Sequence, residues 1–575
     1  MNKKFFKTAL LAVLTMTGLQ ANATNNPKWL KDAVVYQIYP SSFMDTNGDG
    51  YGDLEGIIQK LDYVKSIGVN CIWLNPVYVS GWTDGGYDII DFYKVDKRFG
   101  TNDDLVRLFD ECHKRGIRVL MDLVAGHSSD QSEWFKQSME ASNQRYSDYY
   151  IWLDEEPSEA HENLFGAQAG MANNPYVLAN APRGKYFVKN YYPTQPALNY
   201  GYANPDPSMP WQQGLDAPGP KAVRQELRNI LEFWFQKGAD GFRVDMAASL
   251  VKHDPDKKAT ISIWQDMRKW LDANYPEKIL VAEWANAEQS IVGAKFNIDF
   301  FFPMSGIDAA YSTLFFDKNT PAAATHKAGE PHCYFDLAGD GTNKYFVDMF
   351  TPDYKRVKGQ GYLAIPTANH DFQRPNIGTR NTMDQMKVYM TFFLTMPGVP
   401  FIYYGDEIGM KYQVDAQPKE GSGVRAGSRT PMQWTNGANA GFSTAAAEKL
   451  YFPVDTDNNT LTVESQENDP NSLLNYVRNL LTLRHNTPAL NNDGDWEMVS
   501  ETGAYPMIYK RTDGAENYYV ALNPSGKAVT AVVPTKGTVA ELVVGDAKKV
   551  QYKPGKVTDK ISMKGVTAAV FKVKK

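Results

Sequence analysis

The chain has 575 residues, of which 43% are hydrophobic and 22% charged, so it can bury a large core and is too long for one ordinary domain. Its formal net charge of −6 argues against a polyanion such as nucleic acid as ligand, because phosphate binding needs concentrated Lys and Arg. We therefore expect two or three folded units and a neutral ligand.

The first residues have the three zones of a secretory signal peptide. The basic start Met1-Asn2-Lys3-Lys4 is followed by an apolar stretch over about 9–19 and by the small residues Ala21-Asn22-Ala23. The apolar stretch is shorter than the roughly 20 residues that span a bilayer, so no membrane anchor is expected. The sequence predicts a signal peptide at 1–23 and export of the mature chain, to the periplasm in preference to full secretion.

Apolar runs then alternate with amphipathic stretches. The runs at 34–39, 71–74 and 119–124 are expected strands. Between them, apolar positions recur at helical spacing over 54–67 and 102–115, and each of these expected helices ends near a glycine. A repeated strand and helix pattern predicts a parallel sheet.

Residues 129–220 interrupt the alternation. They are rich in Tyr, Asn, Pro and Gly without sustained periodicity, which predicts an irregular subdomain inserted after the third strand. The alternation resumes with expected helices at 221–237, 260–273 and 471–485 and expected strands at 241–245, 279–283, 296–302, 362–367 and 399–404. Eight strands alternating with helices predict an α/β fold, a (β/α)₈ TIM barrel formed by 24–128 and 221–490. Short Val- and Tyr-rich runs over 491–575 predict a C-terminal antiparallel β-sandwich domain.

Three acids, Asp245, Glu283 and Asp371, each end a short apolar stretch. The loops and catalytic groups of a (β/α)₈ barrel lie at the C-terminal ends of its strands, so these carboxylates are expected to meet there. Paired carboxylates at such a site are typical of glycoside cleavage.

Further motifs accompany the three acids. They are Asp122-Leu123-Val124 through His127, Gly86-Tyr87-Asp88, the run Gly68 to Pro76 and the run Gly398 to Glu407. Together these residues resemble the α-amylase superfamily, glycoside hydrolase family 13, over nearly the whole mature chain. The run Arg429-Thr430-Pro431-Met432-Gln433-Trp434 with Asn439-Ala440-Gly441-Phe442 resembles the branch that contains α-glucosidases, oligo-1,6-glucosidases, sucrose isomerases and trehalose synthases.

This resemblance implies a retaining mechanism with Asp245 as nucleophile and Glu283 as acid/base, about 5–5.5 Å apart. Arg243 is two residues before Asp245 and can project from the same strand face, where its charge should lower the pKa of Asp245. Glu283 must hold its proton near neutral pH, which requires burial or nearby negative charge.

The resemblance also implies a set of substrate-binding residues. Asp371 should hold substrate hydroxyls, His127 and His370 should hydrogen-bond the same sugar ring, and Tyr87 should stack under it. Arg429 should pair with Asp88 and grip the non-reducing-end glucose, which closes the cleft beyond it and favours exo-action. Structural alternatives stay open, namely strand-end acids that cap helices, core histidines, a packing ring and structural ion pairs.

The segment Asp45 to Asp53 has oxygen-bearing side chains at alternate positions and glycines between them. Such spacing suits a structural Ca²⁺, with Asp45, Asn47, Asp49, the Tyr51 carbonyl and Asp53 as ligands. The segment resembles the calcium loop after the first barrel strand in the same branch. An Asx-rich turn without metal is the alternative.

Three positions depart from the family pattern. Gly126 stands where Asn usually precedes the His, and Ala197 stands in Gln195-Pro196-Ala197-Leu198-Asn199 where an Asp is common. The loss of both oxygen ligands argues against the amylase-type calcium site between barrel and insert. Met246, directly after Asp245, is bulkier than the usual residue and is expected to reshape the leaving-group side.

The leading interpretation is an exported retaining α-glucosidase that hydrolyses short malto- or isomalto-oligosaccharides. A trehalose synthase-like isomerase uses the same acids but keeps the cleaved sugar from water. An endo-acting α-amylase or neopullulanase would need an open cleft. A non-catalytic binding or chaperone subunit of the same fold is the alternative from a different class, and the presence of all three acids argues against it.

Overall fold

The computed structural model describes residues 26–141, 145–155, 175–302, 310–317, 332–455 and 461–574. The predicted signal peptide at 1–23 lies outside the described residues and stays a prediction. Within the described ranges, no helix is both long and apolar enough to cross a membrane.

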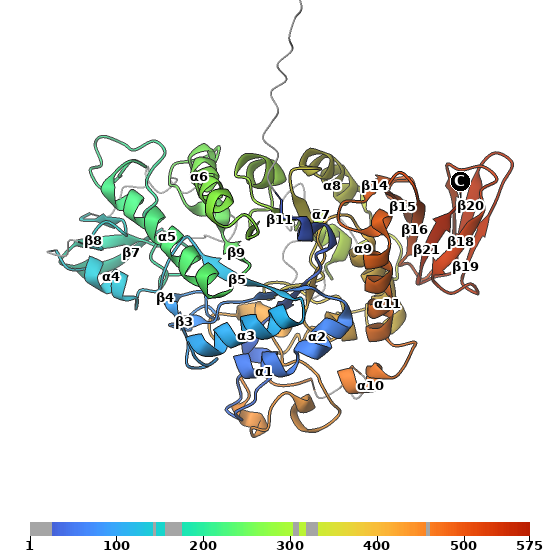
Figure 1. The fold of residues 1–575 in the computed structure, drawn as a ribbon, viewed down its shortest axis with the longest axis horizontal. Coiled ribbons are helices and arrows are strands. Elements are labelled where there is room, and N and C mark those ends of the chain that lie inside the picture. The colour runs from blue at the N-terminus through green and yellow to red at the C-terminus, as the bar shows by residue number, and fades with distance from the viewer. Residues whose placement is uncertain are drawn as a thin grey trace, which may run out of the picture.

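An eight-stranded parallel sheet forms the centre of the molecule (Figure 1). Its order is β12-β11-β10-β9-β5-β2-β1-β13. A parallel bridge from Pro366, just beyond β12, to Phe401 on β13 nearly closes the sheet into a barrel. The predicted (β/α)₈ TIM barrel is therefore confirmed.

All eight barrel strands lie where the sequence predicts them. Their bounds are β1 Val35–Ile38, β2 Cys71–Leu74, β5 Arg118–Val124, β9 Gly241–Asp245, β10 Ile279–Ala282, β11 Ile298–Phe300, β12 Tyr362–Ala364 and β13 Phe401–Tyr403. Most of their side chains are buried, on the barrel interior or under the outer helices, which is why they read as continuous apolar runs.

The outer helices mostly follow the predicted amphipathic stretches. The α-helices are α1 Leu54–Gln59, α2 Leu61–Ile67, α3 Asn102–Lys114, α4 Glu133–Ser138, α5 Pro218–Lys237, α6 Lys258–Asn274, α7 Ala310–Phe315, α8 Lys344–Val357, α9 Met383–Thr395, α10 Val463–Glu467 and α11 Leu473–Asn486. The prediction of a single helix over 54–67 is wrong in detail. The backbone leaves helical geometry at Lys60, and this break divides the segment into α1 and α2.

The segment after β5 contains more regular structure than its composition indicates. Helix α4 is followed by a three-stranded antiparallel sheet of β6 Trp152–Leu153, β8 Gly184–Val188 and β7 Tyr176–Ala181. A smaller hairpin of β3 Tyr78–Ser80 and β4 Ile89–Val95 projects from the barrel after β2. The inserted sheet lies beside β5 and α5 at one side of the barrel, away from the C-terminal strands (Figure 1).

The last segment forms two antiparallel sheets at the opposite side (Figure 1). One has the order β14-β15-β16-β21-β18 and the other β17-β20-β19. Their bounds are β14 Asp495–Met498, β15 Met507–Thr512, β16 Asn517–Asn523, β17 Val529–Val533, β18 Ala540–Val544, β19 Val550–Lys553, β20 Asp559–Met563 and β21 Thr567–Val573. Antiparallel β structure in the C-terminal part is therefore confirmed.

Two buried arginines join these sheets to the barrel. Arg484 on α11 donates to the carbonyls of Leu394, Met396 and Gly398 and to the side chain of Asn492. Arg511 on β15 donates to the carbonyls that flank the same junction. Both side chains are at most 2% exposed, so their charge is solvated by carbonyl oxygens in place of water.

We predict that Arg484→Met destabilises the fold by about 3 kcal/mol or more, because several buried carbonyls lose their donor at once. Thermal unfolding followed by circular dichroism measures the effect. Arg107→Met is the matched control, since that side chain is 45% exposed and its ion pairs contribute little. Equal melting temperatures for the two variants would contradict the prediction.

Candidate active site

The three predicted acids are placed by strands β9, β10 and β12 of the barrel, of which β9 and β10 are neighbours. Asp245 is the last residue of β9, Glu283 follows β10 directly, and Asp371 lies in the loop after β12. Their side chains are 11%, 25% and 28% exposed, so each carboxylate retains limited access to solvent. The strand order brings together residues that are far apart in sequence.

Arg243 links the first two acids through one guanidinium group. Its Nη1 lies 2.9 Å from Asp245 Oδ1 and its Nη2 lies 2.9 Å from Glu283 Oε2. A further ion pair of 3.0 Å joins Nη1 to Asp122 on β5. As the strand period predicts, Arg243 and Asp245 project from the same face of β9. A single bridging guanidinium places the two carboxylates close together, as a retaining pair requires.

Of the two bridged acids, Glu283 has the higher pKa, as an acid/base residue requires. Burial raises the pKa of Asp245 to about 7, against the lowering effect of Arg243. Burial raises the pKa of Glu283 to about 8, and Asp245 and Asp371 add to the rise. Arg243 lowers the pKa of Asp245 as expected, but desolvation outweighs the cation, so the net pKa is raised and not lowered. Glu283 remains the group that holds a proton to higher pH.

Met246 has a left-handed backbone conformation, with φ of 45°. This conformation directs its N–H to Glu283 Oε2, at 2.8 Å. Such a conformation costs energy for a residue other than glycine and is frequent at functional sites. The strained residue therefore ties the end of β9 to the carboxylate after β10.

Asp371 is surrounded by cationic and polar groups. Its Oδ1 accepts from Arg425 at 3.0 Å and from Arg429 at 3.2 Å, and its Oδ2 lies 3.1 Å from His370 Nε2. Burial would raise its pKa, but His370, Arg425 and Arg429 outweigh that effect and hold the pKa well below its usual range. Asp371 is therefore ionised at neutral pH.

The ion pair expected between Arg429 and Asp88 is not the one that forms. Asp88 is fully buried, and its carboxylate accepts from Ser80 Oγ and from the Thr83 and Asp84 backbone N–H groups. Arg429 donates to Asp371 and to the carbonyl of His370. Asp88 thus folds back on its own loop, because adjacent residues such as Tyr87 and Asp88 project in different directions.

In place of the expected Arg429–Asp88 ion pair, an ion pair forms between Arg425 and Asp84. Asp84 Oδ1 accepts from Arg425 Nη2 at 2.9 Å, while Arg425 Nη1 reaches Asp371. Asp84 Oδ2 accepts from Gln195 of the inserted subdomain at 2.9 Å. The sequence analysis did not identify Asp84 or Arg425 as site residues. Both lie close in sequence to residues that it did identify: Asp84 precedes Tyr87 across a Gly-Gly turn, and Arg425 lies one short helical turn before Arg429.

Tyr87 and the two histidines form one network. The Tyr87 ring stacks on His370 with centroids 5.3 Å apart, and its hydroxyl donates to Asp122. His370 Nδ1 accepts from Gln37, and His127 contacts the Tyr87 carbonyl through Nε2. Each histidine therefore has protein partners at both ring nitrogens, and binding of a sugar hydroxyl by His127 would require the release of one of them.

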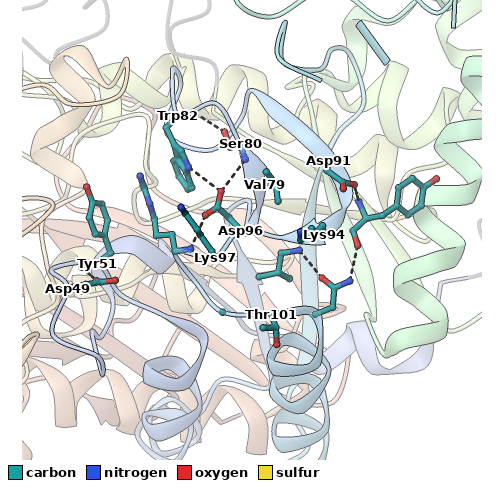
Figure 2. A pocket seen from close by; sticks show the side chains of 15 residues that line it. Asp49, Tyr51, Val79, Ser80, Trp82, Asp91, Lys94, Asp96, Lys97 and Thr101 are labelled. Atoms are coloured by element: carbon teal, nitrogen blue, oxygen red, sulfur yellow. Dashed lines mark hydrogen bonds between the residues drawn. The ribbon is translucent and has the colours of Figure 1, made fainter. Parts of the chain in front are cut away.

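Two aromatic rings, those of Trp82 and Tyr51, contact the guanidinium of Arg98 close to the turn at Asp84. The Arg98 guanidinium lies 3.4 Å from the ring centroid of Trp82 and 4.3 Å from that of Tyr51. Trp82 and Tyr51 lie at one side of a cavity of about 1170 Å³, and Asp96 accepts from the Trp82 indole (Figure 2). Arg98 also forms an ion pair of 2.8 Å with Glu420. The Trp82–Asp84 and 420–425 segments are thereby tied to one cation.

The loop expected to bind calcium is curled by Asx turns. Asp45, Asn47 and Asp49 each accept a hydrogen bond from the backbone N–H two residues later. Asp53 accepts from Thr46 and from the N–H of Gly56, where it caps α1. The atoms of this loop that could bind a metal ion are all oxygen, which fits the chemistry of Ca²⁺. However, in the described ranges no three Asp, Glu, His or Cys side chains cluster in a way that could hold a metal ion.

The chain matches the family model for the α-amylase catalytic domain over residues 37–493. It is 32% identical to an oligo-1,6-glucosidase of Heyndrickxia coagulans over 555 residues, which covers 88% of this chain and 93% of that protein. It is 33% identical to a trehalose synthase/amylase of Mycolicibacterium smegmatis over 481 residues, 79% of this chain and 76% of that protein.

The solved structures that resemble the chain include isomaltulose synthase of Erwinia rhapontici. A mutant of that enzyme in complex with D-glucose superposes with a TM-score of 0.79 at 28% identity, over 96% of this chain and 100% of the other. A second mutant, in complex with its natural substrate sucrose, gives a TM-score of 0.77 at 27% identity, over 96% and 100% of the two chains.

Proposed function

Since this chain belongs to the α-amylase family and is therefore an enzyme of α-glucosidic bonds, we propose that it is a retaining α-glucosidase of short malto- or isomalto-oligosaccharides. Asp245 is the proposed nucleophile, Glu283 the proposed acid/base, and Asp371 the proposed holder of the substrate hydroxyls. The observation that carries the proposal is the bridge from Arg243 to both Asp245 and Glu283.

Two carboxylates with separated pKa values can divide the chemistry between them. At a pH between their pKa values, Asp245 is ionised and can attack the anomeric carbon, while Glu283 retains a proton for the departing oxygen. Water activated by the same Glu283 then hydrolyses the glycosyl-enzyme, which restores the starting protonation states. Arg243 stays charged throughout and limits the repulsion between the two acids.

The ion pair of Asp84 with Arg425 supports action on chain ends. The pair connects to Asp371 through Arg425. We infer that it closes one side of the site with groups that can donate to and accept from sugar hydroxyls. A long glucan needs an open groove on both sides of the cleaved bond. A closed side therefore favours removal of a terminal glucose from a short substrate over endo-cleavage.

An isomerase such as a trehalose synthase is the second candidate. The relatives include both oligo-1,6-glucosidases and trehalose synthases, and hydrolysis and isomerisation start with the same nucleophile. The two outcomes differ in whether water or the released sugar reaches the glycosyl-enzyme first. Product analysis separates them directly.

The purified protein should release glucose from at least one of maltose, maltotriose, isomaltose, panose and sucrose. Proton NMR during the reaction should show the α-anomer of glucose first, as retention requires. Asp245→Asn and Glu283→Gln should each lower kcat by about a thousandfold or more, because the two groups share one mechanism.

Trehalose from maltose, or an isomer from sucrose, would assign the chain to the isomerases. Glucose that appears first as the β-anomer would contradict the retaining mechanism. Undiminished activity in both variants would contradict the assignment of the two acids.

The plot of kcat/KM against pH should be a narrow bell with its maximum between about 7 and about 8. Below it Asp245 is protonated and cannot attack, and above it Glu283 is ionised and cannot donate. These apparent values belong to the coupled pair. A nitrophenyl α-glucoside, whose leaving group needs no proton, should lack the alkaline decline in the Glu283→Gln variant. A constant kcat/KM from about pH 5 to about pH 9 would contradict the proposed pair.

We propose a structural Ca²⁺ in the loop from Asp45 to Asp53, on its oxygen donors and alternate spacing. Calcium at 100 times its dissociation constant should stabilise the folded state by about 2.7 kcal/mol, seen as a higher melting temperature that EDTA reverses. Asp49→Ala should abolish this response. Asp546→Ala is the matched control, because Asp546 makes the same Asx turn in the C-terminal sheets. A melting temperature that is the same with and without calcium would refute the site.

A further inference from the structure

In the described part of the inserted subdomain, segment 188–197 contacts the active site. The bridges Lys189 to Pro196 and Ala197 to His127 are both antiparallel, so the chain folds back on itself and then pairs with the segment that follows β5. Leu198 N–H also donates to the Gly126 carbonyl. This register brings Asn190 over Gly126 and beside His127.

Asn190 is 2% exposed and its amide contacts two groups of the site. Its Nδ2 lies 2.9 Å from His127 Nδ1 and 3.7 Å from the Met246 sulfur. The space for this amide exists because position 126 has no side chain. A Cβ at Gly126 would lie 2.6 Å from Asn190 Nδ2, which is closer than real Cβ contacts.

The proton positions follow from the partners. His127 Nε2 faces the carbonyl of Tyr87 at 3.1 Å, and a carbonyl can only accept, so Nε2 carries the proton. Burial lowers the pKa of His127 to about 4, so the neutral ring has no second proton. Nδ1 must therefore accept, and Asn190 must present its NH₂ group.

The Tyr87 carbonyl, to which His127 donates, belongs to the turn Asp84–Tyr87. The proposed function assigns this turn to the terminal glucose. Tyr87 ends the turn that begins with Asp84, closed by the hydrogen bond from Tyr87 N–H to the Asp84 carbonyl. Gln195, from the same inserted segment, holds the Asp84 carboxylate at 2.9 Å. One end of segment 188–197 thus reaches Tyr87 through His127, and the other end reaches Asp84.

We propose that Asn190 is a positioning residue, supplied by the inserted subdomain and accommodated by Gly126, that fixes the His127 tautomer and so holds the Asp84–Tyr87 turn in its sugar-binding position. It acts through His127 and does not itself touch the reacting atoms. This role rests on the proposed function, because the turn is assigned there to the terminal glucose.

The test is a double-mutant cycle of Asn190→Ala and Gly126→Ala. Asn190→Ala removes the donor, and Gly126→Ala pushes the amide away from His127. Each should weaken the binding of deoxynojirimycin, a glucose-shaped inhibitor, about tenfold, the equivalent of one lost hydrogen bond. In the double variant the effect of the new Cβ should vanish, since the amide that it displaces is already absent. Calorimetry well below the melting temperature measures each dissociation constant.

Asn199→Ala is the matched control. Asn199 is equally buried in the same subdomain, but its Nδ2 donates to the Asp148 carbonyl and to Gln213. This variant should lower the melting temperature and leave the inhibitor affinity unchanged. An unchanged affinity in Asn190→Ala, or fully additive effects of the two substitutions, would overturn the proposal.

A second measurement separates this proposal from the proposed function. Nitrogen NMR of protein with ¹⁵N-labelled histidine reports which ring nitrogen is protonated, and the His127→Asn variant assigns the signal. The wild type should show the Nε2–H tautomer. Asn190→Ala should populate both tautomers, because the ring that has lost its partner at Nδ1 is free to rotate away from the Tyr87 carbonyl. If the wild type neither binds the inhibitor nor cleaves any substrate, the proposed function fails, while a tautomer unaffected by Asn190→Ala overturns the positioning role.

Discussion

The whole site depends on the burial of one cation among three carboxylates. Arg243 is 2% exposed and contacts Asp122, Asp245 and Glu283, which come from the neighbouring strands β5, β9 and β10. Buried charges are costly unless they are paired with good geometry, so the positions of these strands and of the bridged acids Asp245 and Glu283 are coupled. A shift of any one strand would leave a charge unpaired in the barrel interior.

A second group of charged side chains comes from loops and not from barrel strands. Asp371 and Asp84 share Arg425, and Asp371 also contacts Arg429. Loops are intrinsically more mobile than barrel strands, and here they are held by contacts from three directions. Arg98 contacts Trp82, Gln195 of segment 188–197 contacts Asp84, and the loop after β12 supplies Asp371. The end of the site that we propose to hold the terminal glucose is thus formed by segments that are distant in sequence.

The acids alone do not distinguish a hydrolase from an isomerase. In the proposed mechanism both reactions need an ionised Asp245 and a protonated Glu283, and the relatives of this chain include enzymes named for each. The distinction depends on how long the released sugar stays and whether water reaches the glycosyl-enzyme. Met246 donates its backbone N–H to Glu283, and its sulfur lies 3.7 Å from the amide of Asn190. Among the described residues, this contact brings the inserted subdomain next to the residue that follows Asp245.

The sequence by itself determined the eight strands and the three acids, because buried parallel strands are continuous apolar runs and a carboxylate after such a run must lie at the loop end of the barrel. Tertiary structure alone decided which charges pair. Asp88 and Asp84 are equally acidic in sequence, and only the direction of each side chain selects Asp84 for Arg425. The net pKa of Asp245 and the meeting of Gly126 with Asn190 also depend on burial and register, which arise from contacts between segments far apart in the chain.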